Sequence, residues 1–182
     1  DLHIDFTDGN GNVFSGYLDI KVSGNDLTAY DVDVIGSAND ILTPGQTSYV
    51  KIGLQNLGST NANLVTGTIT CASPFVEIID NSGTWSSVSS GGQSFNGNDY
   101  YEISTLEETL PGTIAHLIIN LETADGYASN SIVPIQIGTP TVYDPVGPDD
   151  YGYYIYDNED INYVLAPTYN WVEIDAREGG PG

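Results

Sequence analysis

Apolar and polar residues alternate with a period of two along most of the chain, in runs that end at Gly, Asn, Asp or Pro. Successive side chains of a β-strand point to opposite faces, so these runs predict strands with one dry and one wet face. In one run, Tyr30, Val32 and Val34 form the dry face, whereas Asp31 and Asp33 form the wet face. The runs are 2–6, 18–22, 30–34, 50–55, 65–71, 114–121 and 132–137.

No window of helical length carries apolar residues at i, i+3, i+4 and i+7, so we expect very little helix. Strands at regular spacing with turn residues between them are typical of a sandwich of two antiparallel sheets. The pattern therefore predicts an all-β protein. Its architecture is an antiparallel, immunoglobulin-like β-sandwich with an extra N-terminal hairpin and a tyrosine-rich C-terminal extension.

An internal repeat suggests how the chain is divided. The segments Ile4–Gly9 and Ile20–Gly24 have echoes about 115 residues later, at Ile119–Gly126 and Ile135–Gly138. Because the second hairpin closes the sandwich, we interpret the first as the closing hairpin of a preceding module. A chance resemblance between two unrelated hairpins is the alternative.

The predicted segments are an N-terminal hairpin, a complete sandwich, a Pro-rich linker and a Tyr-rich acidic extension. Their ranges are 1–24, 25–138, 139–150 and 151–182. Proline fixes φ, so the linker is expected to be a semi-rigid spacer. The start at Asp1 without an initiator Met indicates a processed or excised piece.

Charge excludes several classes of partner. The chain carries 25 acidic residues against 3 Lys and Arg, a formal net charge of −22. Such a surface repels phosphate backbones and anionic lipid headgroups, so we expect no nucleic-acid partner. No apolar run approaches the length of a membrane span, so no membrane insertion is expected either. The single cysteine excludes an internal disulfide.

A family resemblance emerges at Thr43-Pro44-Gly45-Gln46 and at Leu54-Gln55-Asn56-Leu57-Gly58. The run from Leu42 to Asp80 resembles the immunoglobulin-like, CARDB-like adhesion modules of secreted bacterial proteins. Such modules follow the catalytic domains of gingipain-type cysteine peptidases and subtilisin-like serine peptidases, often in proteins exported by the type IX route. The resemblance covers about 25–138, and Gln46 stands where the family usually has Glu.

Residues 147–175 also resemble the connector that opens a following module in such proteins. In that family the modules are structural or adhesive, and catalysis lies in other domains. The resemblance therefore implies an extracellular or cell-surface location and no catalytic residues.

The residues themselves also indicate no catalytic site. His3 and His116 are predicted at outward or edge positions of strands, whereas Cys71 follows the apolar face as a small buried hydrophobe. No Gly-x-Ser-x-Gly, His-Glu-x-x-His or phosphate-loop motif occurs. We therefore expect no enzyme, although 25 acids leave chance carboxylate pairs for glycoside chemistry open.

Calcium is the candidate ion, because clustered carboxylates and amides are hard oxygen ligands. The sequence offers three candidate sites, each with an alternative in which the residues are a polar turn or a solvated face. These candidates are Asp8 with Asn10 and Asn12, Asp31 with Asp33, and Asp157 with Asp160. No other cofactor is expected.

The tyrosines of the extension suggest a third kind of partner. Tyr and Trp side chains between Tyr151 and Trp171 could stack on sugar rings while nearby carboxylates accept hydroxyl hydrogen bonds. The alternative is that Tyr153, Ile155, Val164 and Trp171 pack the tail onto the sandwich.

The leading hypothesis is a non-catalytic structural or adhesive module of a secreted or cell-surface bacterial protein. Its partners would be other modules or copies of itself, bound through edge-strand addition. The alternatives are a subunit of a head-to-tail extracellular filament and a carbohydrate-binding module of a hydrolase, with a glycan as partner.

Overall fold

The computed structural model describes residues 2–19, 23–163 and 165–168, and these form strands but no helix. Within this part of the chain, nothing has the helical length and apolar character needed to cross a bilayer. The strands are β1 (Leu2–Thr7), β2 (Val13–Leu18), β3 (Leu27–Val34), β4 (Thr47–Asn56), β5 (Ala62–Cys71), β6 (Val76–Asp80), β7 (Ser82–Val88), β8 (Gln93–Phe95), β9 (Tyr101–Thr105), β10 (Thr113–Glu122) and β11 (Ala128–Ile137).

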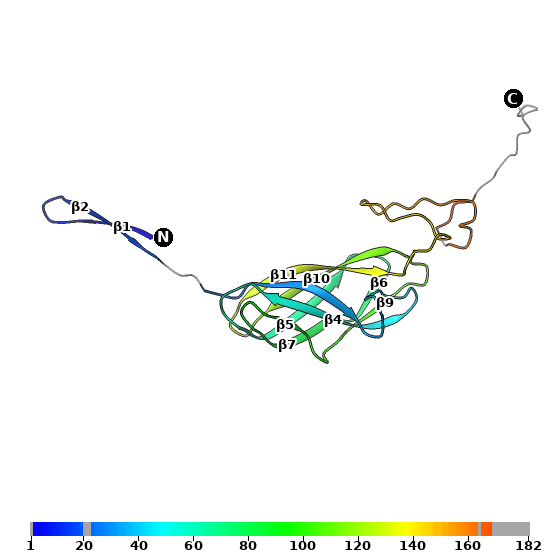
Figure 1. Cartoon of the computed structure of the whole chain (residues 1–182), viewed down its shortest axis with the longest axis horizontal. Helices are drawn as coiled ribbons and strands as arrows, with labels where there is room; N and C mark the ends of the chain where they lie inside the picture. Colours follow the sequence, from blue (N-terminus) through cyan, green and yellow to red (C-terminus); the bar gives the residue numbers. More distant parts are fainter. Residues whose placement is uncertain (1, 20–22, 164, 169–182) are drawn as a thin grey trace, which may run out of the picture.

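Strands β3 to β11 form two antiparallel sheets. One sheet has the order β11-β10-β5-β7, and the other has the order β3-β4-β9-β6 with β8 paired to β4. The sheets face each other (Figure 1), and their inward side chains make one continuous core. The prediction of an all-β, immunoglobulin-like sandwich is confirmed.

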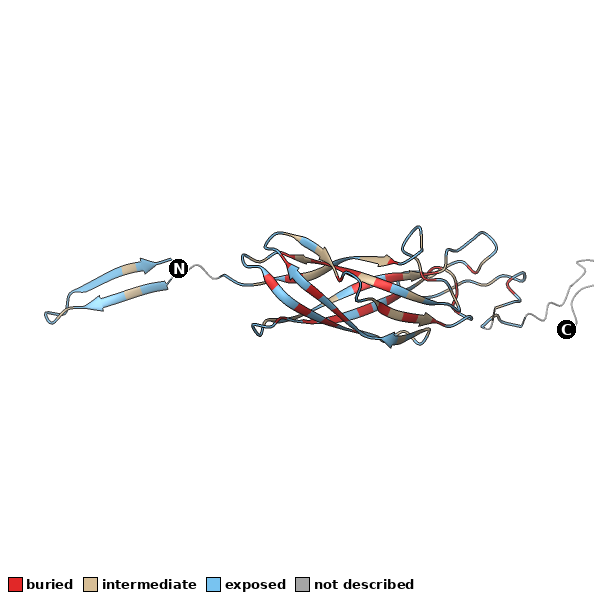
Figure 2. Ribbon diagram, turned by 90° about the horizontal axis from the view of Figure 1, so that it is seen from below, coloured by how far each residue is buried: buried red, intermediate tan, exposed pale blue. Residues whose placement is uncertain are grey.

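The core contains the residues that the alternating pattern places inside. In β5, Val65, Gly67 and Ile69 are buried while the threonines between them are exposed, and β10 alternates in the same way (Figure 2). Trp85 and Tyr101 are the largest of the fully buried side chains. The Trp85 Nε1–H donates to the Ile52 carbonyl at 3.2 Å and the Tyr101 hydroxyl to the Gly67 carbonyl at 3.2 Å. Both polar groups therefore have partners in the core.

The prediction that Tyr30 lies on the dry face of β3 is wrong. A register shift between Ala29 and Asp31 makes Ala29 and Val32 the core-facing residues on its two sides. A β-bulge inserts one extra residue and so reverses the phase of the alternation. Tyr30 consequently lies partly exposed over Gly53, with its ring edge-on to Phe95.

The residues that carry the family resemblance shape loops. Pro44 and Gly45 form the centre of a turn in which the Gln46 N–H donates to the Thr43 carbonyl at 3.1 Å, and Gly45 has φ of +72°. Asn56 is fully buried, and its side-chain amide joins the loop after β4 to the end of β7 and to the segment before β3. This side chain donates to the Thr60 and Val88 carbonyls and accepts from the N–H groups of Asp26 and Gly58.

The first two strands form a separate hairpin. β1 and β2 pair with each other, and Figures 1 and 2 show them beyond one end of the sandwich instead of on its surface. The turn between them spans residues 8–12, and the second strand is Val13–Leu18 instead of the predicted 18–22. Residues 20–22 lie outside the described part of the chain.

Residues 139–163 continue from the opposite end of the sandwich (Figure 1). Val146 and Ile155 exchange backbone hydrogen bonds, which closes a small loop across the predicted boundary at residue 150. The Tyr154 hydroxyl lies 2.8 Å from the Thr113 hydroxyl and ties this loop to β10.

The chain therefore enters and leaves the sandwich at opposite ends. At the entry, the Leu27 N–H donates to the hydroxyl of Tyr127, which lies in the β10–β11 turn. At the exit, Ile137 bridges Leu42 in the loop after β3. The ten residues of β11 run between the two ends, a length of about 34 Å.

Candidate functional site

The N-terminal hairpin has one apolar face. Antiparallel partners share a face, and the pairs Leu2↔Leu18, Ile4↔Gly16 and Phe6↔Phe14 put five apolar side chains together. Phe6 and Phe14 are 61% and 59% exposed. Sequence reasoning missed Phe14 as part of this face. The signal was its position opposite Phe6 across a five-residue turn.

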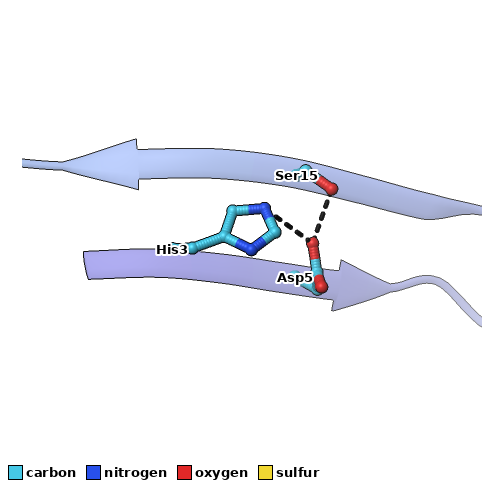
Figure 3. Close-up of polar contacts among 3 residues, drawn as sticks. All are labelled: His3, Asp5 and Ser15. Atoms are coloured by element: carbon cyan, nitrogen blue, oxygen red, sulfur yellow. Dashed lines mark hydrogen bonds and ion pairs between the residues drawn. The ribbon is translucent and has the colours of Figure 1, made fainter. Parts of the chain in front are cut away.

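The other face of the hairpin combines a polar network (Figure 3) with the exposed side chains of Val13 and Tyr17. The Asp5 carboxylate accepts a hydrogen bond from the Ser15 hydroxyl at 2.5 Å and lies 3.3 Å from His3 Nε2. The Tyr17 ring stacks on the His3 ring at a centroid distance of 4.8 Å. A nucleophile–base pair would need the serine hydroxyl to donate to the histidine. Here the serine donates to the carboxylate, so the arrangement is a cross-strand polar network.

The first calcium candidate is the turn of this hairpin. Asp8 accepts hydrogen bonds from the N–H groups of Asn10 and Asn12, both at 2.9 Å, and from the Asn12 side-chain amide. The bond from the Asn12 side chain, followed by the backbone bonds, lowers the pKa of the Asp8 carboxyl. The three residues are thus together, with the Asp8 oxygens directed into the turn.

The second candidate lies on β3. Asp31 is exposed and accepts from the Val32 N–H at 2.9 Å, whereas Asp33 is directly opposite Lys51 in the strand register. The ammonium group of Lys51 lies 5.4 Å from the centre of the Tyr100 ring. The Lys51 ammonium therefore lies against Tyr100, and within the described residues it forms no ion pair with either carboxylate.

The third candidate lies in the extension. Asp157 and Asp160 are joined because the Asp157 N–H donates to Asp160 Oδ2 at 2.7 Å, and Asp160 is buried. Both line a hollow of about 260 Å³ together with Asp144 and Glu159. The Tyr163 hydroxyl donates to Asp144, which lowers the pKa of that carboxyl and raises the pKa of Tyr163 to about 12.

No group of three or more His, Cys, Asp or Glu side chains is arranged as a metal site within the described residues. The carboxylates of Asp8, Asp31, Asp157 and Asp160 instead accept hydrogen bonds from backbone N–H groups. Calcium binding at these residues stays a prediction.

The tyrosines of the extension differ in exposure. Tyr151 and Tyr153 are 86% and 71% exposed, whereas Tyr154 is half-buried against Thr113. A groove of about 720 Å³ separates this loop from the sandwich, and Tyr151, Tyr154 and His116 line it. The alternative that Tyr153 and Ile155 pack the tail is wrong, because both side chains are exposed. Trp171 and Val164 lie outside the described residues.

Cys71 ends β5 and packs against the core as predicted, but its side chain is half-buried and not fully buried. His116 lies on the exposed face of β10. The two faces of a strand separate outward from inward side chains, so His116 is directed away from the core that Cys71 contacts.

No family model matches the sequence, and no curated protein matches it. Several solved structures are similar at low identity. The CARDB domain of a Pyrococcus furiosus protein, solved with di-metal ions, aligns at 7% identity and a TM-score of 0.39, covering 66% of this chain and 100% of the domain. A fragment of Escherichia coli alpha-2-macroglobulin aligns at 10% identity and a TM-score of 0.40, covering 64% of this chain and 17% of the fragment.

A cohesin module of a Clostridium perfringens glycoside hydrolase aligns at 11% identity and a TM-score of 0.31, covering 65% of this chain and 100% of the module. All three likenesses are distant. The assignment of this chain as an immunoglobulin-like β-sandwich rests on its own sheet order and core.

Proposed function

We propose that this chain is a non-catalytic structural module of a secreted or cell-surface bacterial protein, acting as a spacer or adhesive unit. The observation that carries the proposal is that the chain enters and leaves the sandwich at opposite ends of its long direction (Figure 1). A rigid sandwich connected in this way holds its two neighbours in a longer chain apart.

Three further features support this role. The sandwich interior is filled by the two facing sheets. The net charge of −22 keeps a crowded surface protein soluble. The Pro44-Gly45 turn and the buried Asn56 lie in the run that resembles secreted adhesion modules, and both shape loops of the sandwich. The resemblance to modules of gingipain-type and subtilisin-like peptidases supports an extracellular location and export by the type IX route.

Antibodies against the full chain test the location. We expect them to label intact source cells or to detect the protein in the culture medium. Brief proteinase K treatment of intact cells should remove the surface label, and a cytoplasmic marker should survive as the control. Labelling that requires permeabilised cells would contradict the proposal.

A glycan-binding role is the second candidate, because Tyr151 and Tyr153 are exposed beside the carboxylates Asp149 and Asp150. A glycan array should then give signals that the double substitution Tyr151→Ala and Tyr153→Ala removes. Substitution of the equally exposed Tyr17 serves as the control. An array without signals for the unsubstituted chain would end this candidate.

A further inference from the structure

The β1–β2 hairpin has the geometry of the β10–β11 hairpin of the sandwich. Each pair of strands is joined by a turn of five residues, 8–12 and 123–127. In the first turn, the Asp8 N–H donates to the Asn12 carbonyl at 2.9 Å and the Gly11 N–H to the Asp8 carbonyl at 3.0 Å. In the second turn, the Thr123 N–H donates to the Tyr127 carbonyl and the Gly126 N–H to the Thr123 carbonyl, both at 3.0 Å.

The equivalence extends to side chains and backbone angles. Gly11 and Gly126 both adopt positive φ, at 85° and 89°. The Asp8 carboxylate accepts from the Asn12 N–H, just as the Thr123 hydroxyl accepts from the Tyr127 N–H. The strand pairs also correspond: Leu2↔Leu18, Ile4↔Gly16 and Phe6↔Phe14 take the places of Leu117↔Val133, Ile119↔Ser131 and Leu121↔Ser129. The two hairpins therefore agree in turn hydrogen bonds, register and apolar phase.

The two hairpins differ in what covers them. Leu117, Ile119 and Leu121 are completely buried, whereas their counterparts Leu2 and Phe6 are 47% and 61% exposed. A two-stranded hairpin alone is at best marginally stable in water. The apolar face of β1–β2 is therefore a surface made for contact with other strands.

The sandwich shows which strands those are. β10 lies between β11 and β5 and pairs with β5 from Leu117↔Cys71 to Glu122↔Thr66. The apolar face of β10 packs on the opposite sheet. β11 remains the edge of its sheet. The equivalent partner strand would therefore pair with β1 and not with β2. The polar network of His3, Asp5 and Ser15 would then face solvent (Figure 3).

We propose that β1–β2 is the closing hairpin of a second immunoglobulin-like sandwich, which lacks β10 and β11 equivalents of its own and adds a β5-like strand to β1. This inference rests on the proposed role as one module in a string. Another copy of this chain does not offer such an edge, because its β5 is already paired on one side with β10 and on the other with β7.

The acceptor sandwich differs from this one near the turn. Phe6 and Phe14 stand where this sandwich has Leu121 and Ser129, so the acceptor core must leave more room there. A repacked hairpin with Phe6→Leu and Phe14→Ser should fit a copy of this sandwich more closely, since overpacking a core costs stability.

A tandem chimera tests the proposal. A copy of residues 25–116 is joined directly to residue 2 of the chain, so that β1–β2 occupies the position of β10–β11 in the copied sandwich. Hydrogen exchange of the peptide 2–18 is compared between the chain, this chimera and a chimera with the repacked hairpin. In the chain we expect fast exchange, and in the repacked chimera exchange slower by at least about 100-fold.

Substitutions on the two hairpin faces supply matched controls. Ile4→Asn on the apolar face should abolish protection of the hairpin in the repacked chimera, whereas His3→Asn on the polar face should leave it unchanged. Fast exchange of the hairpin in both chimeras would overturn the proposal. The proposal would also be overturned if the chain alone assembled with increasing concentration in sedimentation and its hairpin became protected from exchange. The partner of the hairpin would then be another copy of the chain in a filament. Surface labelling of cells is independent of both results.

Discussion

The buried side chain of Asn56 uses all of its hydrogen-bonding groups to join separate loops. Its amide donates at 2.7 Å to Thr60 and at 3.1 Å to Val88, and its carbonyl oxygen accepts from Asp26 and Gly58. Truncation would leave buried backbone groups without partners, which is costly in a low-dielectric interior. We expect Asn56→Ala to lower the free energy of unfolding by about 2–4 kcal/mol, measured by urea denaturation.

Asn120→Ala is the matched control for this substitution. Asn120 lies on the exposed face of β10, so its replacement should change the unfolding free energy by less than about 0.5 kcal/mol. Equal effects of the two substitutions would show that Asn56 has no special structural role.

A second residue-scale prediction concerns Tyr163 in the extension. Its hydrogen bond to Asp144 raises the pKa of Tyr163 to about 12 and lowers the pKa of the Asp144 carboxyl. The raised tyrosine pKa stabilises the loop fully below pH 10, the ordinary tyrosine value, and the contribution disappears as the pH rises through about 12. The lowered carboxyl pKa stabilises the loop above about pH 3.8, and this part disappears as the pH falls through the folded value.

Asp144→Asn should therefore bring the pKa of Tyr163 down towards about 10. The titration is followed by NMR of the tyrosine ring carbons, which separates Tyr163 from the other tyrosines. The ring-carbon signals of Tyr151, which is exposed in the same extension, serve as the internal reference in both proteins. An unchanged Tyr163 titration would contradict the hydrogen bond.

Among the elements, those with large apolar residues at every second position could be predicted from the sequence. β4, β5, β10 and β11 have this pattern, and each is a long strand with a buried face. The strands between residues 76 and 105 were missed, and β6 and β9 are short runs of five residues. β7 places Gly83 beside Trp85 on its inner face, and a glycine gives no apolar signal. β8 is only three residues long.

Residue 83 faces inward, and it is a glycine because the opposite sheet fills the space that a side chain would need. It pairs with Gly67 across β5 and β7, and the ring of Tyr101 fills the gap that the two glycines leave. A Cβ atom on Gly83 would lie 2.6 Å from Tyr101 Cζ, which is too close for two carbon atoms.

We therefore expect Gly83→Ala to destabilise the sandwich by about 1–3 kcal/mol, measured by urea denaturation with near-UV circular dichroism. The aromatic signal should also change, because Tyr101 and Trp85 are neighbours. Ser86→Ala on the exposed face of the same strand should leave both unchanged. A neutral Gly83→Ala would mean that the sheets separate more easily than this packing indicates.

At the scale of the whole molecule, the sequence predicted the division into hairpin and sandwich from a repeat. The full contact face of the hairpin was not predictable, because it depends on register. Phe14 belongs to that face only because it is paired with Phe6, and pairing is set by the length of the turn. The acidic clusters were visible in the sequence. Which backbone N–H groups donate hydrogen bonds to their oxygens depends on loop conformation.

Net charge is a whole-molecule property with a measurable consequence. A charge of −22 repels itself more in the compact state than in the unfolded chain. Salt screens this repulsion, because the Debye length shortens from about 20 Å to about 7 Å between 20 and 200 mM ionic strength. We expect the melting temperature to rise by about 2–5 °C over this range, equally in sodium chloride and choline chloride. A constant or falling melting temperature would contradict the argument.

Calcium is distinguished from this general screening by comparison with magnesium at equal ionic strength. Calcium accepts irregular sets of oxygen ligands that magnesium does not, so a specific calcium site raises stability in calcium alone. Of the three candidate sites, only Asp31 and Asp33 belong to the sandwich, and Lys51 is opposite Asp33. We therefore expect the sandwich to melt at the same temperature in the two salts. A rise in calcium that Asp31→Asn removes would instead place an ion on β3, whereas binding by the extension or the hairpin would leave this melting temperature unaltered.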